Sequence, residues 1–238
     1  MKRRIHVPPG RIEGSTARLD EAGRHYLHDV LRLEPGAAVE VFDGRGGLYD
    51  AQVQAGFEAL ALGPRRDAPP GGAPLHLAVA LAKGEKIDLV VQKATELGVA
   101  RIVPWEAARS VVRLEGERAE ERARRWRRIA EEAARQCGRA DVPEVRAPAS
   151  LGELAAELPP GFLPILFHGE GSVPIARLPA AGGVVAIVGP EGGLTPAELG
   201  ALERAGAVRA SLGPRTLRAE TAAIAAVALL QARYGDMG

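Results

Sequence analysis

The sequence has 238 residues, of which 46% are apolar and 26% are charged, and its formal net charge is +1. These values are typical of an ordinary globular protein. Because the net charge is close to zero, any surface that binds nucleic acid must be a local basic patch. The single cysteine, Cys137, excludes an intramolecular disulfide and a cysteine-based metal site, and it suits a reducing cytoplasm.

Neither a membrane span nor a leader segment is indicated. The longest uninterrupted apolar stretch, residues 222–230, is too short to cross a bilayer. The basic start, MKRRIHVPPG, is not followed by the apolar core of a signal peptide. We therefore expect a cytoplasmic protein without a membrane partner.

Residues 4–62 have the pattern of a small β-rich domain. Arg4 to Val7 is a candidate strand, and residues 39–42 and 48–53 flank the glycine-rich turn 43–47 as a hairpin. This turn lies between strands and opens no helix, so it is not a phosphate loop. Residues 20–33 have helical spacing. We predict a small β-barrel with one helix, forming a domain over residues 1–68.

Residues 65–74, RRDAPPGGAP, have the composition of a linker, and a second domain is predicted at 74–238. Strands and helices then alternate, which is typical of a parallel α/β sheet. The predicted strands are 75–81, 102–103 (ending at Pro104), 163–167, 184–188 and 208–212. The predicted helices are 84–97 with Gly98 as its C-terminal glycine, 115–136, one from the Ser150 cap to Leu158, one after the Thr195 cap, and 219–234.

Two turns in this second part follow buried strands and precede helices. The first is residues 189–193 and the second is residues 212–218. Both turns lie at the carboxyl edge of the predicted sheet, which is where open α/β sheets bind ligands. A glycine-rich turn before a helix is also a common structural element, so the first turn alone does not establish a site.

The first turn, GPEGG, matches neither common nucleotide loop. No Lys-Ser/Thr pair follows it, and it lacks the spacing of a dinucleotide fingerprint. Pro190 removes an amide that would hold phosphate, and Glu191 would repel a pyrophosphate. The turn suits a neutral or cationic ligand held by backbone groups.

Several motifs together carry a resemblance to a known family. They are GPEGG (189–193), LGPRTLRAETA (212–222), KATELGV (93–99), RSVV (109–112), HYLHDVLRLEPG (25–36) and the helix at 124–145. By these motifs, which occur along the chain in the family's order, it resembles the RsmE family, SPOUT-class methyltransferases that act on N3 of a uridine in 16S ribosomal RNA. Thr216 and Cys137 depart from the residues common in the family, away from the expected chemistry.

The resemblance implies a fold, a cofactor and partners. It implies a PUA-like RNA-binding barrel and a parallel α/β domain with a deep trefoil knot that binds S-adenosylmethionine. The partners would be 16S ribosomal RNA or the small subunit, and a second copy paired through knot-side helices including the last one. The expected cofactor-binding residues are Leu166, Phe167, His168, Gly169, Ile187, Gly189, Pro190, Glu191, Gly192, Gly193, Leu212, Gly213, Pro214, Leu217, Arg218 and Thr221.

Methyl transfer from a sulfonium needs no metal, and none is predicted. Arg218 is the candidate for stabilising the charge that spreads over the uracil oxygens, since a guanidinium can fork onto carbonyls. Glu191 or Glu220 is the candidate base, and the choice stays open because an ordinary carboxylate is a weak base unless buried. Glu220 also has a purely structural explanation, because a negative charge in the first turn of a helix interacts favourably with the helix dipole.

The candidate RNA contacts are basic residues in both domains: Arg4, Arg24, His25, His28, Arg32, Lys93, Arg109 and Arg135. His25 and His28 have no third ligand nearby, which disfavours a metal pair. The arginines of 124–128 form either a phosphate track or a solvated helix face interleaved with glutamates.

Two other functions stay open at this stage. One is ribose 2′-O methylation with the same knot and cofactor, and the other is a non-enzymatic rRNA-binding assembly factor. The sequence does not distinguish which nucleotide is modified, or free RNA from an assembled subunit.

Overall fold

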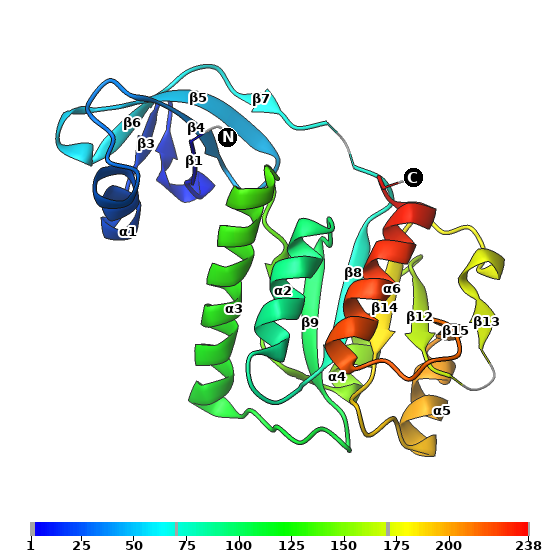
Figure 1. Cartoon of the computed structure of the whole chain (residues 1–238). Helices are drawn as coiled ribbons and strands as arrows, with labels where there is room; N and C mark the ends of the chain where they lie inside the picture. The colour runs from blue at the N-terminus through cyan, green and yellow to red at the C-terminus, as the bar shows by residue number, and fades with distance from the viewer. Residues whose placement is uncertain (1–2, 70, 170–171, 238) are drawn as a thin grey trace. The chain divides into compact units, whose positions relative to one another are not determined.

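The computed structural model describes residues 3–69, 71–169 and 172–237, and the chain forms two compact units (Figure 1). The N-terminal unit consists of residues 1–70 with 134–142, and the C-terminal unit of residues 71–133 with 143–238. Pro70, inside the predicted linker, lies outside the described residues.

The N-terminal unit is a curled sheet whose pairing follows the open path β1-β4-β5-β6-β3-β2, with β7 also paired to β5. Its strands are β1 (Arg4–His6), β2 (Ile12–Glu13), β3 (Thr16–Arg18), β4 (Ala38–Phe42), β5 (Gly47–Val53), β6 (Ala59–Leu62) and β7 (Arg66–Asp67). The predicted hairpin is confirmed, because β4 and β5 pair antiparallel around a turn in which Asp43 Oδ1 accepts from the amides of Arg45 and Gly47. The strand β7 falls within the segment predicted as linker.

The predicted helix 20–33 is shorter and less regular than expected. Asp20 caps α1 (Glu21–His25) by accepting a hydrogen bond from Gly23 N at 2.8 Å, and the chain continues as a π-helical turn, Tyr26–Val30. Arg32 then has φ of 50°, a left-handed conformation that a helix does not tolerate. This turn brings Leu27 and Leu33 into the core of the unit.

The C-terminal unit is built on a sheet in which every strand pairing is parallel, as predicted. The strand order is β10-β9-β8-β14-β12-β15-β13, with β11 also paired to β9. The strands are β8 (Leu75–Ala80), β9 (Arg101–Glu106), β10 (Glu144–Val145), β11 (Ala149–Ser150), β12 (Leu163–Phe167), β13 (Val173–Pro174), β14 (Val184–Val188) and β15 (Val208–Ser211).

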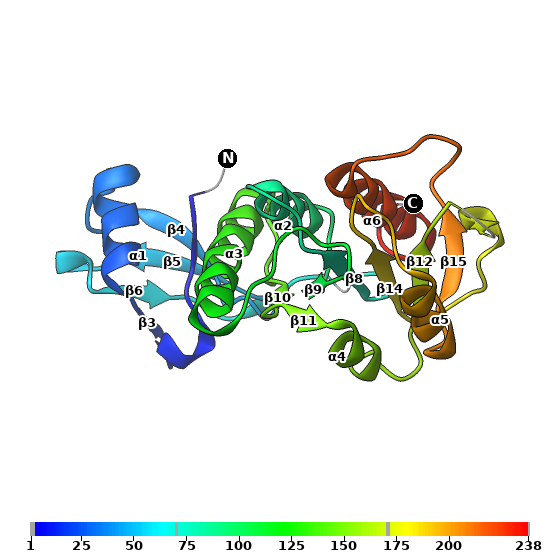
Figure 2. The same ribbon diagram turned by 90° about the horizontal axis from the view of Figure 1, so that it is seen from below.

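Helices cover both faces of this sheet: α2, α3 and α6 lie on one face, and α4 and α5 on the other (Figures 1 and 2). They are α2 (Lys86–Glu96), α3 (Gly116–Cys137), α4 (Leu151–Ala156), α5 (Pro196–Arg204) and α6 (Ala219–Tyr234), and short 3-10 turns lie at Pro9–Arg11, Ala55–Phe57 and Ile175–Arg177. Ser150 and Thr195 cap α4 and α5 as predicted, each in a capping box, and α4 ends at Ala156, before the predicted end at Leu158. No helix in the described ranges has the length and apolarity needed to cross a membrane.

The strand predicted to end at Pro104 instead continues to Glu106. Ile102 O accepts from Arg146 N on one side of β9, whereas Trp105 O accepts from Leu81 N on the other. The nitrogen of Pro104 therefore faces the same side as Ile102, where β10 has ended and β11 has not begun. A proline is tolerated there because no ladder hydrogen bond is lost.

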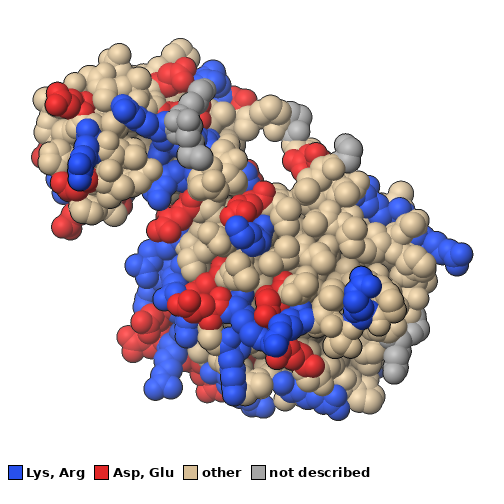
Figure 3. All heavy atoms as spheres, viewed as in Figure 1, with Lys and Arg blue, Asp and Glu red and all other residues tan. Residues whose placement is uncertain are grey.

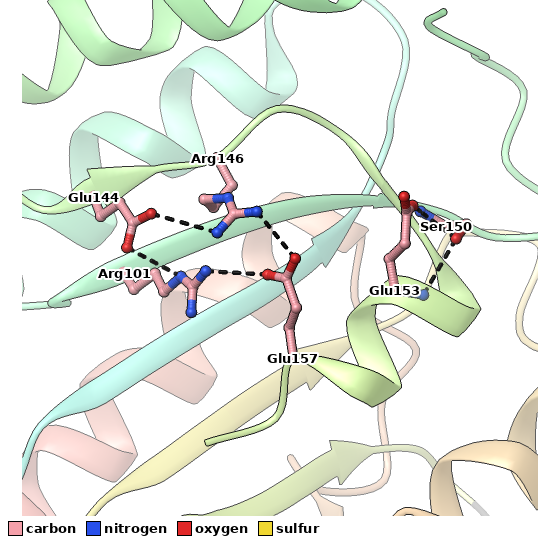
Figure 4. Close-up of polar contacts among 6 residues, drawn as sticks. All are labelled: Arg101, Glu144, Arg146, Ser150, Glu153 and Glu157. Carbon is pink, nitrogen blue, oxygen red and sulfur yellow. Dashed lines mark hydrogen bonds and ion pairs between the residues drawn. The ribbon is translucent and has the colours of Figure 1, made fainter. Parts of the chain in front are cut away.

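An ion-pair network ties β9, β10 and α4 together at the amino end of β9 (Figure 4). Arg101 pairs with Glu144 at 3.2 Å and with Glu157 at 3.1 Å, and Arg146 joins Glu157 at 3.0 Å. This edge of the sheet is opposite to the strand ends that carry the glycine-rich turns. We assign the network to holding the short edge strand and α4 in place.

Candidate active site

Three neighbouring strands end at one edge of the sheet and bring the predicted turns together. Phe167, the last residue of β12, pairs with Val188 of β14 and with Ala210 of β15. The segments that begin at His168, Gly189 and Leu212 therefore leave the sheet side by side. This is the arrangement that the sequence predicted for the ligand edge.

A cavity of about 340 Å³ opens between the first and third of these segments. Its lining comes from the end of β12, the turn after β15 and the start of α6: Phe167, His168, Gly169, Ser211, Leu212, Gly213, Pro214, Arg215, Thr216, Leu217 and Ala222. Gly213 has φ of 99°, a conformation that favours glycine, and its amide donates to Ser211 Oγ at 3.1 Å. The size suits a small-molecule ligand.

The other predicted cofactor residues do not line this cavity. Leu166 and Ile187 are buried within the sheet beneath it. Residues 189–193 form the neighbouring turn, and Arg218 and Thr221 belong to the start of α6. The cavity thus unites the segments after β12 and β15, whereas the GPEGG turn lies beside it at the same sheet edge.

The segment that follows the GPEGG turn is held to residues 107–110 by a buried carboxylate. Glu198 is 6% exposed; its Oε1 accepts from Ala108 N at 2.7 Å and its Oε2 from Thr195 N at 2.7 Å. Burial raises the pKa of Glu198, but the hydrogen bonds from Ala108 and Thr195 outweigh it and leave the pKa below its usual value. Arg109 Nη1 also donates to Gly192 O at 2.9 Å, so residues 107–110 and the turn form one packed unit.

Four charged side chains meet beside the turn, and we call them the Lys86 cluster: Lys86, Glu191, Arg218 and Glu220. The ammonium of Lys86 donates a hydrogen bond to Glu191 Oε1 and lies 3.5 Å from Glu220 Oε2. Arg218 Nη1 lies 4.0 Å from Glu191 Oε1. The side chain of Arg218 is 74% exposed, that of Glu191 48% and that of Glu220 only 16%.

The cluster makes the two glutamates unequal. The hydrogen bond from Lys86 and its charge lower the pKa of Glu191, and the same bond raises the pKa of Lys86. Glu191 is therefore held ionised and is a poor proton acceptor. Glu220 Oε2 is buried and accepts no hydrogen bond from the described residues.

Sequence reasoning missed Lys86, although one signal was present. A lysine at the first position of a helix is disfavoured by the helix dipole, so its presence there calls for nearby carboxylates. Lys86 opens α2, which has no side-chain cap, just after the carboxyl end of β8. That edge is the ligand edge of the sheet.

The predicted RNA contacts of the N-terminal unit fall into two groups. Arg24, His25, His28 and Arg32 are exposed along α1 and the π-helical turn. Both histidines bond Asp29, at 2.8 Å and 2.7 Å, and the bonds from His28 and His25 lower the pKa of that carboxyl. The guanidinium of Arg135, near the end of α3, lies 4.1 Å from the ring centre of Tyr26 in the π-helical turn.

Arg4 is different, and the expectation of an RNA contact there is wrong. Its side chain is buried, pairs with Glu40 at 2.7 Å and donates to Arg139 O at 3.1 Å. The guanidinium serves the packing of the N-terminal unit and has little surface left for a phosphate.

The basic residues of the C-terminal unit are partly engaged within the protein. Lys93 pairs with Glu96 along α2 at 2.9 Å, two turns away from Lys86, and Arg109 holds the GPEGG turn. On α3, Arg125 pairs with Asp88 and Arg127 donates to Val145 O. Arg124 and Arg128 lie exposed on the helix. Two of the four arginines in 124–128 are thus structural, which weakens the phosphate-track interpretation.

The fold and the comparisons together define the class of protein. A parallel sheet with a ligand cavity at its carboxyl edge is compatible with several enzyme classes, and the family models identify this one as an RNA methyltransferase. Residues 70–231 match the family model for an RNA methyltransferase domain, and residues 19–60 match that for an RNA methyltransferase PUA domain.

Within this class, the chain belongs to the RsmE family, as the sequence motifs predicted. It is 36% identical to ribosomal RNA small subunit methyltransferase E of Mycobacterium tuberculosis, over 93% of this chain and 89% of the relative. It is 34% identical to the protein of that name from Synechocystis, over 98% and 78%.

Solved structures agree with this assignment. A ribosomal RNA small subunit methyltransferase E from Neisseria gonorrhoeae, bound to S-adenosyl methionine, is 30% identical with a TM-score of 0.91 and all of both chains covered. A Legionella pneumophila structure in complex with the bound cofactor SAM is 32% identical with a TM-score of 0.91 and 99% of both chains covered.

Proposed function

We propose that the protein transfers a methyl group from S-adenosylmethionine to N3 of a uridine in 16S ribosomal RNA. The observation that carries the proposal is the 340 Å³ cavity between the segments after β12 and β15, in a chain 30–32% identical to two structures that hold this cofactor. The family assignment supports the RNA substrate.

The cavity has the chemistry that S-adenosylmethionine requires. Its lining is mostly backbone and apolar side chain, with Gly169, Gly213 and Pro214 allowing a ligand to approach the main chain. When bound, the cofactor supplies a methyl group on a sulfonium for direct displacement. The protein must then orient the uracil, remove the N3 proton and stabilise the charge that develops on the carbonyl oxygens.

The residues of the Lys86 cluster are suited to different parts of this reaction. Arg218, exposed at the start of α6, presents a fork of donors to the uracil oxygens. Between the two glutamates, Glu220 is favoured as the proton acceptor because it is largely buried and its Oε2 has only the longer, 3.5 Å ion pair with Lys86. Glu191 is disfavoured by its hydrogen bond to Lys86 and by its lowered pKa.

Arg218→Ala is expected to lower kcat by about 10²–10³-fold, the usual loss for one donor to a developing oxyanion. Cofactor affinity should change little, because Arg218 does not line the cavity. Arg218→Lys keeps the positive charge but loses the paired N–H donors of the guanidinium, so its kcat should lie between those of the wild type and Arg218→Ala. Methyl transfer to 16S RNA and calorimetric titration of S-adenosylmethionine measure both effects. Unchanged turnover in Arg218→Ala would remove this residue from the mechanism.

The partners follow from both units. The exposed basic stretch from Arg24 to Arg32 supports RNA binding by the N-terminal unit. A homodimer through α6 is supported by Leu229 and by Leu89 of the adjacent α2, which are exposed, and by the mostly uncharged surface over α6 in Figure 3. The trefoil knot and a cytoplasmic location are proposed with them.

Mapping the methyl group on product RNA by mass spectrometry tests the proposed function. A methyl on uracil N3 supports it, and a methyl on a ribose 2′-oxygen would make the protein a ribose methyltransferase. If the protein binds RNA but neither binds S-adenosylmethionine nor transfers a methyl group, it is a non-enzymatic assembly factor. Testing naked RNA and assembled subunits in parallel identifies the substrate.

A further inference from the structure

Lys86 joins three segments that are far apart in the sequence. It is the first residue of α2, and its ammonium lies between Glu191, in the turn after β14, and Glu220, in the first turn of α6. The residues it connects are separated by 105 and 134 positions, so only the folded site brings them together. None of these contacts is needed to form α2 itself.

The position of Lys86 is unfavourable for its own helix. A positive charge at a helix N-terminus opposes the helix dipole, whereas acidic residues are favoured there. Glu85, the residue before it, makes no side-chain capping bond. The two carboxylates that face Lys86 therefore account for its placement better than the stability of α2 does.

Lys86 also balances the charges of the site. Without it, Glu191 and Glu220 would have only Arg218 as a cationic neighbour within the Lys86 cluster. Arg218 approaches Glu191 no closer than 4.0 Å and is largely exposed, so solvent screens its charge. Without Lys86, the GPEGG turn would therefore lose the hydrogen bond that joins Glu191 to α2.

We propose that Lys86 is a positioning residue for methyl transfer. Its hydrogen bond to Glu191 holds the GPEGG turn against the start of α2. Lys86 engages Glu191 by a hydrogen bond and Glu220 Oε2 only by a longer ion pair of 3.5 Å, so it fixes the first carboxylate more tightly than the second. This inference rests on the proposed function and adds to it a residue that neither binds the cofactor nor meets the uracil.

The test compares variants that remove the charge with variants that keep it. Lys86→Met preserves length without the charge, and we expect about tenfold weaker S-adenosylmethionine binding and about tenfold lower kcat, within the range of coupled contacts. Lys86→Arg should restore both to within about threefold, because it can still donate to Glu191. Lys83→Met, at an exposed lysine just before α2, is the matched control for cofactor affinity.

A double-mutant cycle shows whether the effect runs through Glu191. Glu191→Gln alters an exposed turn residue, so it should fold normally and reproduce the loss of affinity seen in Lys86→Met. The double variant Lys86→Met/Glu191→Gln should be no worse than either single variant. Losses that multiply, or a Lys86→Met variant with unchanged affinity and kcat, would overturn the proposal.

Two readouts separate this proposal from the proposed function. If the wild-type protein puts no methyl on uracil N3, the proposed function fails, while cofactor titration still reports whether Lys86 positions the turn. If wild type methylates N3 and the Lys86 variants match it in both readouts, only the positioning role fails. Thermal unfolding of each variant confirms that the fold is intact.

Discussion

Glu220→Gln is expected to lower kcat by about 10²–10⁴-fold, the usual contribution of a positioned general base. The amide keeps the shape of the side chain but takes up no proton at neutral pH. Glu220 stands in the first turn of α6, largely buried, with Lys86 at 3.5 Å and no hydrogen bond from the described residues on Oε2. Of the two carboxylates in the Lys86 cluster, it is the one that Lys86 does not hold by a hydrogen bond.

Glu191→Gln is the control for this prediction, since it makes the same change in the same cluster. We expect a loss of kcat no greater than about tenfold, because Glu191 acts through the position of its turn. Single-turnover methyl transfer at saturating S-adenosylmethionine separates chemistry from binding. If Glu191→Gln proves the more damaging variant, the base is Glu191 and the assignment to Glu220 is wrong.

The sheet and its ligand edge were predictable because their signals are local. The strands 163–167 and 184–188 are continuous apolar runs bounded by turn residues, and both occur with the predicted bounds. The helix 219–234 also has the predicted bounds, and the Thr195 cap fixes the start of α5. Since parallel strands end at a common edge, the two turns had to meet.

The charged partners were not predictable because they depend on tertiary placement. Lys86 is one of only four lysines, but its carboxylate partners lie in segments far away in the sequence and meet it only when the chain is folded and α2 packs beside α6. The sequence predicts Arg4 to be a surface residue because it lies in a basic N-terminal stretch. In the structure it is buried, where it pairs with Glu40 and donates to the carbonyl of Arg139. The same charge near a chain end serves RNA binding or packing, depending on partners that lie far away in sequence.

Local irregularities were missed for a related reason. The helical spacing of 20–33 is real, but the π-helical turn at Tyr26–Val30 and the left-handed Arg32 end the helix early. Periodicity does not distinguish an α-turn from a π-turn over five residues. The extension of β9 past Pro104 likewise depended on where its edge neighbours stop.

Asp88→Ala should destabilise the C-terminal unit by about 2–3 kcal/mol, the range for a buried donor that loses its acceptor. Asp88 is 9% exposed on α2, and its Oδ1 accepts from the indole N–H of Trp126 on α3 at 2.9 Å. Trp126 is buried, so no solvent replaces the lost acceptor. Arg125 also bonds Oδ2 at 2.8 Å, but it is well exposed and can return to water.

Asp88→Asn separates the contribution of the hydrogen bond to stability from that of the charge. Its amide oxygen can still accept from Trp126, whereas the ion pair with Arg125 is lost. We expect it to cost well under half of the loss in Asp88→Ala, since exposed ion pairs contribute little. The chain has two tryptophans, Trp105 and Trp126, both in the C-terminal unit, so urea unfolding followed by tryptophan fluorescence reports on that unit. Equal destabilisation by Asp88→Asn and Asp88→Ala would show that the charge pair, and not the bond to Trp126, holds α3 against α2. The bond to Trp126 explains why a carboxylate is buried between these helices at all, because an indole N–H buried there needs an acceptor that an apolar side chain cannot supply.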